Sequence, residues 1–166
     1  AAQHPGAGRG GVGRGREMTA AGQGARIVAA ARGWIGRPYV HQTSCRGAGA
    51  DCLGLVRGVW REVGGELPIA VPAYTPDWAE ARGEETLLAG VANVLTPVAR
   101  AEAVPGDVLV FRMRSRSVAK HLGLLCTVGA APSFIHAYSG PAVLESPLSP
   151  PWARRIAAVF RLPEGG

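Results

Sequence analysis

The apolar residues of two segments in the first half of the chain recur every three or four positions, which is the period of an α-helix. The second segment, 51–65, starts at Asp51, a favourable N-cap, and ends in a Gly-Gly pair that favours a helix stop. We therefore predict helices over 25–34 and 51–65. Their apolar stripes consist of Ile27, Ala30, Ala31 and Trp34 in the first, and of Val56, Val59, Trp60 and Val63 in the second.

Short runs rich in Val, Leu, Ile and Phe follow the Pro-Gly-Asp turn at 105–107. These runs predict four strands, over 108–113, 121–128, 133–138 and 156–162. The proline-rich stretch before the turn is expected to be irregular, with a short helix within 78–95. Helices followed by strands with short turns are typical of an α+β domain, here with N-terminal helices packed on an antiparallel sheet.

The composition fits one globular domain that follows a polar tail. The chain has 166 residues, of which 47% are apolar and 18% charged, enough for a single hydrophobic core. Residues 1–17 are rich in Gly and Arg and almost free of apolar side chains, so burial cannot offset the entropy of ordering them. We predict a disordered tail over 1–17 and one domain over 18–166.

Charge and hydropathy give expectations about the partner and the location of the protein. The net charge of +6 suits a polyanionic partner, such as nucleic acid or anionic cell wall. No segment approaches the roughly 18 consecutive apolar residues of a membrane span, and the N-terminal residues lack the apolar region of a secretory signal. We therefore expect no membrane span, and synthesis in the cytoplasm.

The three cysteines, Cys45, Cys52 and Cys126, are an odd number, which does not indicate a disulfide framework. Cys52 follows the N-cap residue and lies in the first turn of the second predicted helix. The helix dipole and the backbone N–H groups there favour a thiolate, so we expect this position to lower the pKa of Cys52. The alternative is a small buried apolar side chain, the commonest state of a free cysteine.

Strand periodicity separates His121 from Cys126. One face of 121–128 carries His121, Gly123 and Leu125, and the other carries Leu122, Leu124 and Cys126. The second face is wholly apolar, so Cys126 is predicted to be a core residue and not a nucleophile. Gly123, which lacks a side chain, would allow a helix end to approach the histidine face.

A second histidine, His136, lies in the next predicted strand. A hairpin that turns near Val128-Gly129 would bring His121 and His136 opposite each other on one face. A histidine base needs its second ring nitrogen held by another group, and His136 is the candidate for that role. Cys52, His121 and His136 thus form a candidate nucleophile, base and orienting residue, as in papain-like thiol hydrolases.

Five short motifs resemble, in order and spacing, the NlpC family of cell-wall peptidases. They are PYV at 38–40, DCLGLV at 51–56, PGD at 105–107, HLGLL at 121–125 and FIHA at 134–137. The resemblance extends from Arg26 to Leu162. It implies a compact papain-like α+β fold, no cofactor or metal, and hydrolysis of the bond between γ-D-glutamate and a diamino acid in the peptide stems of peptidoglycan.

The resemblance also implies roles for five residues by their positions. Cys52 matches the nucleophile, His121 the general base, and His136 the orienting third residue. Tyr39 and Asp51 match residues that line the substrate subsite beside the nucleophile.

Three features resemble the branch of the family found in tail proteins of phages and phage-like gene transfer agents. They are Leu53 after the nucleophile, His41-Gln42 after PYV, and AYTPDW at 73–78. The common family pattern has Ser where this chain has Leu53, and Trp-Gly-Gly where it has His41-Gln42-Thr43. Both differences bear on which bond is cleaved and leave the predicted fold unchanged. The branch implies tail-tip or baseplate partners and action on a target cell wall from a phage-like particle. Val71–Trp78 is the candidate docking surface.

A metal site and a nucleic-acid-binding module are alternative interpretations. The zinc-type ligands His41, Cys45, Cys52, His121, Cys126 and His136 show no CxxC or HExxH spacing, and strand periodicity turns Cys126 away from His121. The basic residues Arg112, Arg114, Arg116 and Lys120 suit nucleic acid as well as the carboxylates of a stem peptide. No nucleic-acid-binding motif accompanies them, so no specific nucleic-acid partner is expected.

Two further interpretations keep the fold and change the function. A catalytically inactive structural subunit of a tail tip has no physical need for Cys52, His121 and His136 together, so their presence favours catalysis. An amidase or acyl transferase could use the same thiol chemistry.

Overall fold

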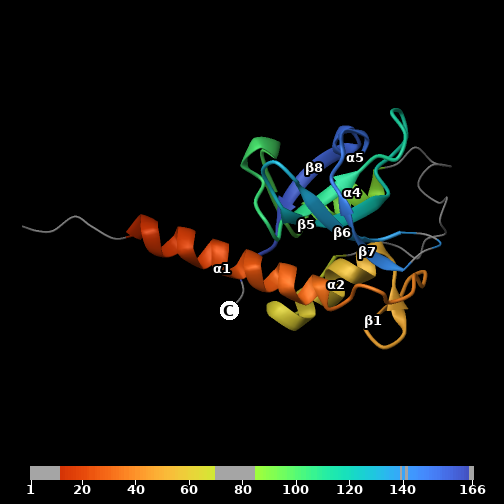
Figure 1. Ribbon diagram of the computed structural model, residues 1–166, viewed down its shortest axis with the longest axis horizontal. Helices are drawn as coiled ribbons and strands as arrows, with labels where there is room; N and C mark the ends of the chain where they lie inside the picture. Colours follow the sequence, from red (N-terminus) through yellow and green to blue (C-terminus); the bar gives the residue numbers. More distant parts are fainter. Residues whose placement is uncertain (1–11, 70–84, 139, 141, 165–166) are drawn as a thin grey trace, which may run out of the picture.

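The computed structural model describes residues 12–69, 85–138, 140 and 142–164, with side chains from residue 21 onward. Figure 1 shows its elements, several of which are labelled. In chain order they are α1 (Val12–Arg32), β1 (Ser44–Cys45), β2 (Gly49–Ala50), α2 (Cys52–Val63), α4 (Thr86–Ala92), β3 (Thr96–Val98), the 3-10 turn η1 (Arg100–Glu102), β4 (Val108–Phe111), β5 (His121–Thr127), β6 (Ser133–Ala137), β7 (Val143–Pro147), α5 (Pro150–Arg154) and β8 (Ile156–Arg161).

Six of the strands form one antiparallel sheet in the order β3-β8-β4-β5-β6-β7, and β1 pairs with β2 separately. Helices α1 and α2 lie side by side and pack on one face of the sheet, against β5 (Figure 1). The predicted arrangement, an α+β fold with N-terminal helices packed on an antiparallel sheet, is confirmed.

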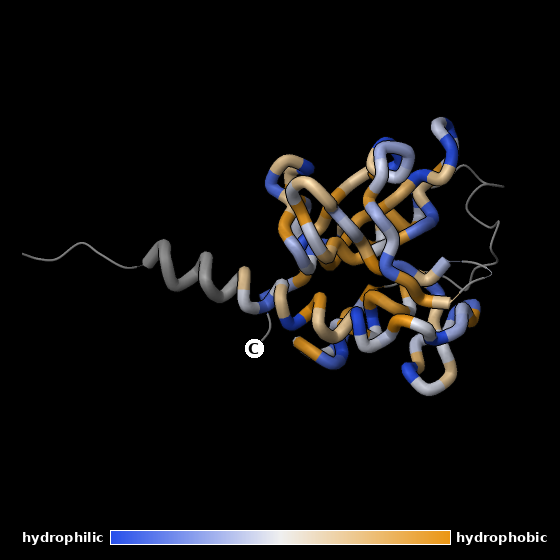
Figure 2. The backbone as a smooth tube through the Cα atoms, in the orientation of Figure 1, coloured by the Kyte–Doolittle hydropathy of each residue, from blue (hydrophilic) through white to orange (hydrophobic). Residues whose placement is uncertain are grey.

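The two faces of the sheet carry two separate apolar clusters. The larger lies between the sheet and the helices, where orange segments of both face each other in Figure 2, and it contains Leu122, Leu124 and Cys126 of β5. The smaller lies on the outer face and contains Phe111 and Phe134, with Trp152 of α5 packed against it. The assignment of Cys126 to the core is therefore confirmed.

The N-terminus of α2 is held by its cap and by the preceding loop. Asp51 accepts a hydrogen bond from the Gly54 N–H through Oδ1 and another from the Gln42 N–H through Oδ2, both at 2.7 Å. A Cβ atom at Gly54 would lie 1.9 Å from the Thr43 carbonyl oxygen, so only glycine allows this close approach. These contacts place the first residue of the helix, Cys52, at a defined point beside the loop.

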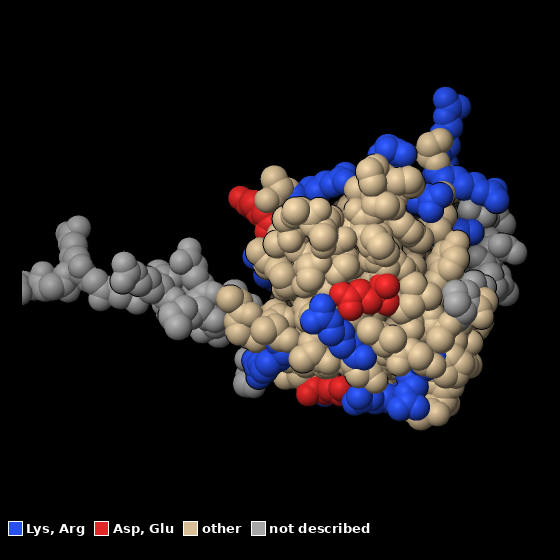
Figure 3. Space-filling view, in the orientation of Figure 1, with Lys and Arg blue, Asp and Glu red and all other residues tan. Residues whose placement is uncertain are grey.

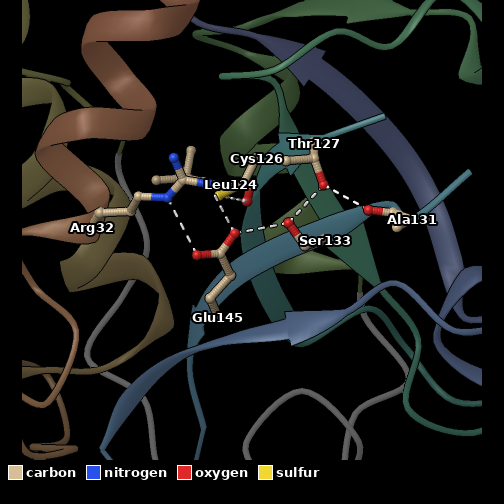
Figure 4. Close-up of polar contacts among 7 residues, drawn as sticks. All are labelled: Arg32, Leu124, Cys126, Thr127, Ala131, Ser133 and Glu145. Atoms are coloured by element: carbon tan, nitrogen blue, oxygen red, sulfur yellow. Dashed lines mark hydrogen bonds and ion pairs between the residues drawn. The ribbon is translucent and has the colours of Figure 1, made fainter. Parts of the chain in front are cut away.

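A polar network ties α1 to the edge of the sheet (Figure 4). Arg32 donates to both carboxylate oxygens of Glu145 on β7, at 3.1 and 3.2 Å. Glu145 also accepts from the Ser133 hydroxyl, which lies 2.8 Å from the hydroxyl of Thr127. The network spans β5, β6 and β7 and fixes how these strands are aligned beneath the helix.

The structure differs from the sequence-based expectations at several places. Residues 12–17, which the sequence analysis placed in the tail, lie within helix α1. Residues 1–11 and the proposed docking surface at 71–78 lie outside the described residues. Strand β7 and the short strands β1, β2 and β3 were not predicted. None of the described helices has the length and apolar character needed to cross a membrane.

Candidate active site

Cys52 lies where the N-terminus of α2 meets the start of β5. Its thiol contacts the carbonyl oxygen of Lys120 at 3.9 Å, and the backbone N–H of Leu122 acts on the same sulfur atom. The two residues that flank His121 thus both contact Cys52. The described hydrogen bond of the thiol is made to the backbone and not to the imidazole ring.

His121 and His136 are hydrogen-bonded to each other. The Nε2 atom of His121 lies 2.8 Å from the Nδ1 atom of His136, and both rings are buried. The strand register sets Leu124 opposite Ile135, so His121 and His136 are diagonal neighbours, not direct opposites. Because the offset is two residues, both rings stay on the same face, as predicted.

Aromatic side chains enclose the histidine pair on the outer face of the sheet. The Trp152 ring centroid lies 5.1 Å from that of His136 and 5.9 Å from that of His121. Phe134 packs on His136 at 4.3 Å. A Cβ atom at Gly123 would lie 2.8 Å from the Phe134 ring, so Gly123 makes room for this aromatic packing, and the expectation that it admits a helix end is wrong.

Tyr39 and Asp51, the two substrate-subsite candidates, lie beside Cys52. Asp51 is almost fully buried and caps α2 directly before the cysteine. Burial raises the pKa of Tyr39, and the nearby Cys52 and Asp51 add to that effect. Tyr39, Asp51 and Cys52 thus form one group, and His121 and His136 form another. The described link between the two groups is the contact of Cys52 with the backbone of Lys120 and Leu122.

The thiol of Cys52 is neutral in the structure. Burial raises its pKa to about 12, and the adjacent Asp51 carboxylate adds to the shift, whereas the backbone N–H groups of Leu122, Leu53 and Cys52 act in the opposite direction. The expectation that the helix position lowers this pKa is therefore wrong, because burial and a neighbouring negative charge outweigh the helix.

Both histidines are also neutral at pH 7. Burial lowers the pKa of His121 to about 3, with a further contribution from the neighbouring His136, and burial lowers the pKa of His136 to about 4. A neutral imidazole has one ring nitrogen with a free lone pair, so His121 is unprotonated at neutral pH and, with its lowered pKa, is a weak base.

These lowered pKa values make the fold sensitive to acid. An unfolded histidine binds a proton below about pH 6.5, whereas folded His136 and His121 bind theirs only near pH 4 and pH 3. Within that window the unfolded state carries more protons. We therefore expect the free energy of unfolding to fall as the pH falls, by up to about 1.4 kcal/mol per pH unit for each histidine. Urea unfolding at pH 7 and pH 5 measures the change.

The double substitution His121→Gln with His136→Gln is the control for this prediction, because glutamine does not titrate. The loss of stability between pH 7 and pH 5 should be smaller in the double variant than in the parent protein. Equal losses would contradict the assignment of the acid sensitivity to the buried pair.

The remaining cysteines do not join this site. Cys45 is exposed on β1, and Cys126 is buried on the helix side of the sheet, where burial raises its pKa to about 12. Among the described residues, no three His, Cys, Asp or Glu side chains gather in a way that could hold a metal ion. Of the three cysteines, only Cys52 contacts the backbone on either side of His121.

The basic residues before His121 are not one uniform patch. Arg112 is paired with Glu85, and Arg114 and Arg116 are exposed in the loop between β4 and β5. On the face shown in Figure 3, Lys and Arg side chains lie mostly near the edges, with uncharged surface between them. The face shown in Figure 3 thus carries no single continuous basic patch.

Ser146 is a polar neighbour of the site that the sequence analysis missed. Its hydroxyl lies 2.9 Å from Nε2 of His136. Ser146 belongs to β7, whose short sequence mixes polar residues with a proline and carries no clear strand signal. The residues of this strand therefore gave no pattern from which Ser146 could have been found.

Comparison with known proteins identifies the family and the fold of the chain. The family model described as the NlpC/P60 family matches residues 36–161, which include Tyr39, Asp51, Cys52, His121 and His136. None of the curated proteins compared with the chain matches it.

Several solved structures share the fold at low sequence identity. The crystal structure of the NlpC/p60 domain of the peptidoglycan hydrolase SagA is 23% identical, with a TM-score of 0.58, and the match covers 84% of this chain and 98% of that one. An NLP/P60 family protein similar to a lipoprotein, from Staphylococcus aureus, is 19% identical with a TM-score of 0.60. An NlpC/P60 family protein from Bacillus cereus is 17% identical with a TM-score of 0.58. These two matches cover 85% and 84% of this chain but only 41% and 40% of the larger proteins.

Proposed function

The chain belongs to the NlpC/P60 family, and from this we propose that it is a cysteine peptidase that hydrolyses the peptide stems of bacterial cell wall. The observation that carries the proposal is the position of the Cys52 thiol, which contacts the backbone on both sides of His121 while His121 is bonded to His136. A thiol, a neutral base and an orienting group are the parts that nucleophilic acyl transfer requires.

The first half of the proposed reaction forms a thioester. Because Nε2 of His121 is engaged by His136, its Nδ1 atom is left to take the thiol proton as Cys52 turns toward the ring. The sulfur then attacks the carbonyl carbon of the scissile amide. Backbone N–H groups at the N-terminus of α2 stabilise the oxyanion that forms. His121 returns its proton to the leaving amine, and the C–N bond breaks.

The second half of the reaction releases the product. A water molecule gives a proton to His121 and attacks the thioester carbonyl carbon. The C–S bond then breaks, the thiol regains its proton, and a carboxylic acid leaves. The resting neutral thiol and imidazole are both restored, in agreement with the raised pKa of Cys52 and the lowered pKa of His121.

We further propose that the bond cleaved joins γ-D-glutamate to a diamino acid. The support is the match of Tyr39 and Asp51 to subsite residues and their position beside Cys52. Leu53, one of the two departures from the common pattern, is buried in the main core. The other departure, His41-Gln42-Thr43, contacts Asp51 through the Gln42 N–H and is the segment that would alter the choice of bond.

Digestion of purified sacculi tests the enzymatic proposal. The protein is incubated with sacculi, and the soluble fragments are identified by mass spectrometry. Fragments that end in γ-D-glutamate, with new amino groups on the diamino acid, are expected. Release of free stem peptides from the glycan strand would instead indicate an amidase, and no release would favour a structural role.

We also propose that the protein acts from a phage-like tail, with tail-tip or baseplate partners. The support is the sequence resemblance at Leu53, His41-Gln42 and residues 73–78, the last of which lie outside the described residues. The protein should co-purify with tailed particles at a few copies per tail. Its complete absence from purified particles would overturn this proposal and leave the peptidase proposal intact.

A further inference from the structure

The hydrogen-bonded chain that starts at His121 continues beyond His136. The Nε2 atom of His136 lies 2.9 Å from the hydroxyl oxygen of Ser146 on β7. The register of β6 and β7 sets Phe134 opposite Ser146, so Ser146 is the diagonal neighbour of His136 on the same face of the sheet. We propose that Ser146 is a positioning residue of the active site, an inference that rests on the peptidase function proposed above.

The role of His121 as base fixes which ring nitrogens of His121 and His136 carry hydrogen. To accept the Cys52 proton at Nδ1, His121 must carry its own hydrogen on Nε2 and donate it to Nδ1 of His136. His136 then carries its hydrogen on Nε2, where the Ser146 hydroxyl accepts it. Ser146 thus holds His136 in the tautomer and ring orientation in which its lone pair faces His121.

The neighbouring residue on β7 anchors Ser146 from the opposite face of the sheet. Side chains alternate along a strand, and Glu145 points to the helix side, where it accepts from Arg32 and Ser133 (Figure 4). If β7 shifted by one residue along β6, Glu145 would lose its contacts with Arg32 and Ser133, and the Ser146 side chain would point away from His136. The network around Glu145 therefore keeps the Ser146 hydroxyl at the histidine pair.

The matched variants Ser146→Thr and Ser146→Val test this role, because threonine and valine have nearly the same shape and differ in the hydroxyl group. The Thr variant should keep kcat within about twofold of the parent protein. The Val variant should lose about tenfold in kcat, the effect of one orienting hydrogen bond, with little change in KM. Thr96→Val, which removes an exposed hydroxyl from β3 at the opposite edge of the sheet, is the control and should leave kcat unchanged.

Nitrogen NMR of the substrate-free protein tests the proton positions directly. At pH 7 the hydrogen of His136 is expected on Nε2 in the parent protein and in Ser146→Thr, and a mixture of tautomers is expected in Ser146→Val. The inference is overturned if His136 carries its hydrogen on Nδ1 in the parent protein, if Ser146→Val keeps both the parent tautomer and the parent kcat, or if Thr96→Val loses as much activity as Ser146→Val.

The peptidase function and the positioning role of Ser146 are tested by separate measurements. The tautomer is measured without substrate, so its value does not depend on whether the chain cleaves peptidoglycan. A protein that leaves sacculi intact but shows the Nε2 tautomer, lost in Ser146→Val, would retain the positioning role of Ser146 and lose the proposed peptidase function.

Discussion

Replacing Cys52 by Ala is expected to abolish the release of peptide fragments from sacculi, with a loss of at least about 10⁴-fold in rate. The proposed reaction forms a bond to the sulfur atom, so no other side chain can substitute for it. Folding should be retained, because Cys52 is half-buried at the start of α2 and the cap formed by Asp51 stays in place. Mass spectrometry of the digest and a thermal melt measure the two properties separately.

The other two cysteines provide matched controls for this result. Cys45→Ser should keep full activity, because Cys45 is exposed and lies outside the site. Cys126→Ala should keep its activity and lose about 1 kcal/mol of stability, because it removes a buried sulfur atom from the core. Digestion of sacculi by Cys52→Ala at a rate near that of the parent protein would disprove the proposed mechanism.

The second large effect is expected from His121→Ala, which removes the base. The loss should again reach about 10⁴-fold, because the neutral thiol, with its raised pKa, has no other proton acceptor in the proposed reaction. His136→Gln should lose only about ten- to a hundredfold, since a glutamine side-chain oxygen can accept the hydrogen bond from Nε2 of His121. Rates of fragment release from sacculi distinguish the two variants.

The substitution His136→Ala tests whether a hydrogen-bond acceptor at this position is needed for activity. His136→Ala offers no acceptor and should be less active than His136→Gln, while both variants should keep the fold. Equal and complete loss in His121→Ala and His136→Gln would contradict the separate roles of base and orienting residue.

Local sequence patterns were sufficient for the parts of the fold and site that depend on near neighbours. The helical period and the N-cap predicted that Cys52 begins a helix, and α2 starts at that residue. Strand alternation predicted that Cys126 faces the core and that His121 and His136 share the other face, as the structure confirms. These features depend only on the 3.6- and 2-residue periods of regular structure.

Features that depend on contacts between distant segments could not be predicted in this way. The offset between His121 and His136 follows from a turn over 128–132 and a register shift between Leu125 and Thr127, which local periodicity does not specify. Strand β7 has too short and too polar a sequence to be recognised, so Ser146 was missed. The network of Glu145 with Arg32 and Ser133 joins residues more than ten positions apart.

The fold class, the family resemblance and the set of candidate residues could be predicted from the sequence, because each rests on local pattern and on the order of short motifs. The pKa shifts at the site could not, because they arise from burial in the folded protein. A helix start favours a thiolate, yet burial and Asp51 raise the pKa of Cys52, and burial lowers the pKa of both histidines. Loss of solvation depends on every segment packed around a group, so its effect on a pKa emerges only when the chain is folded.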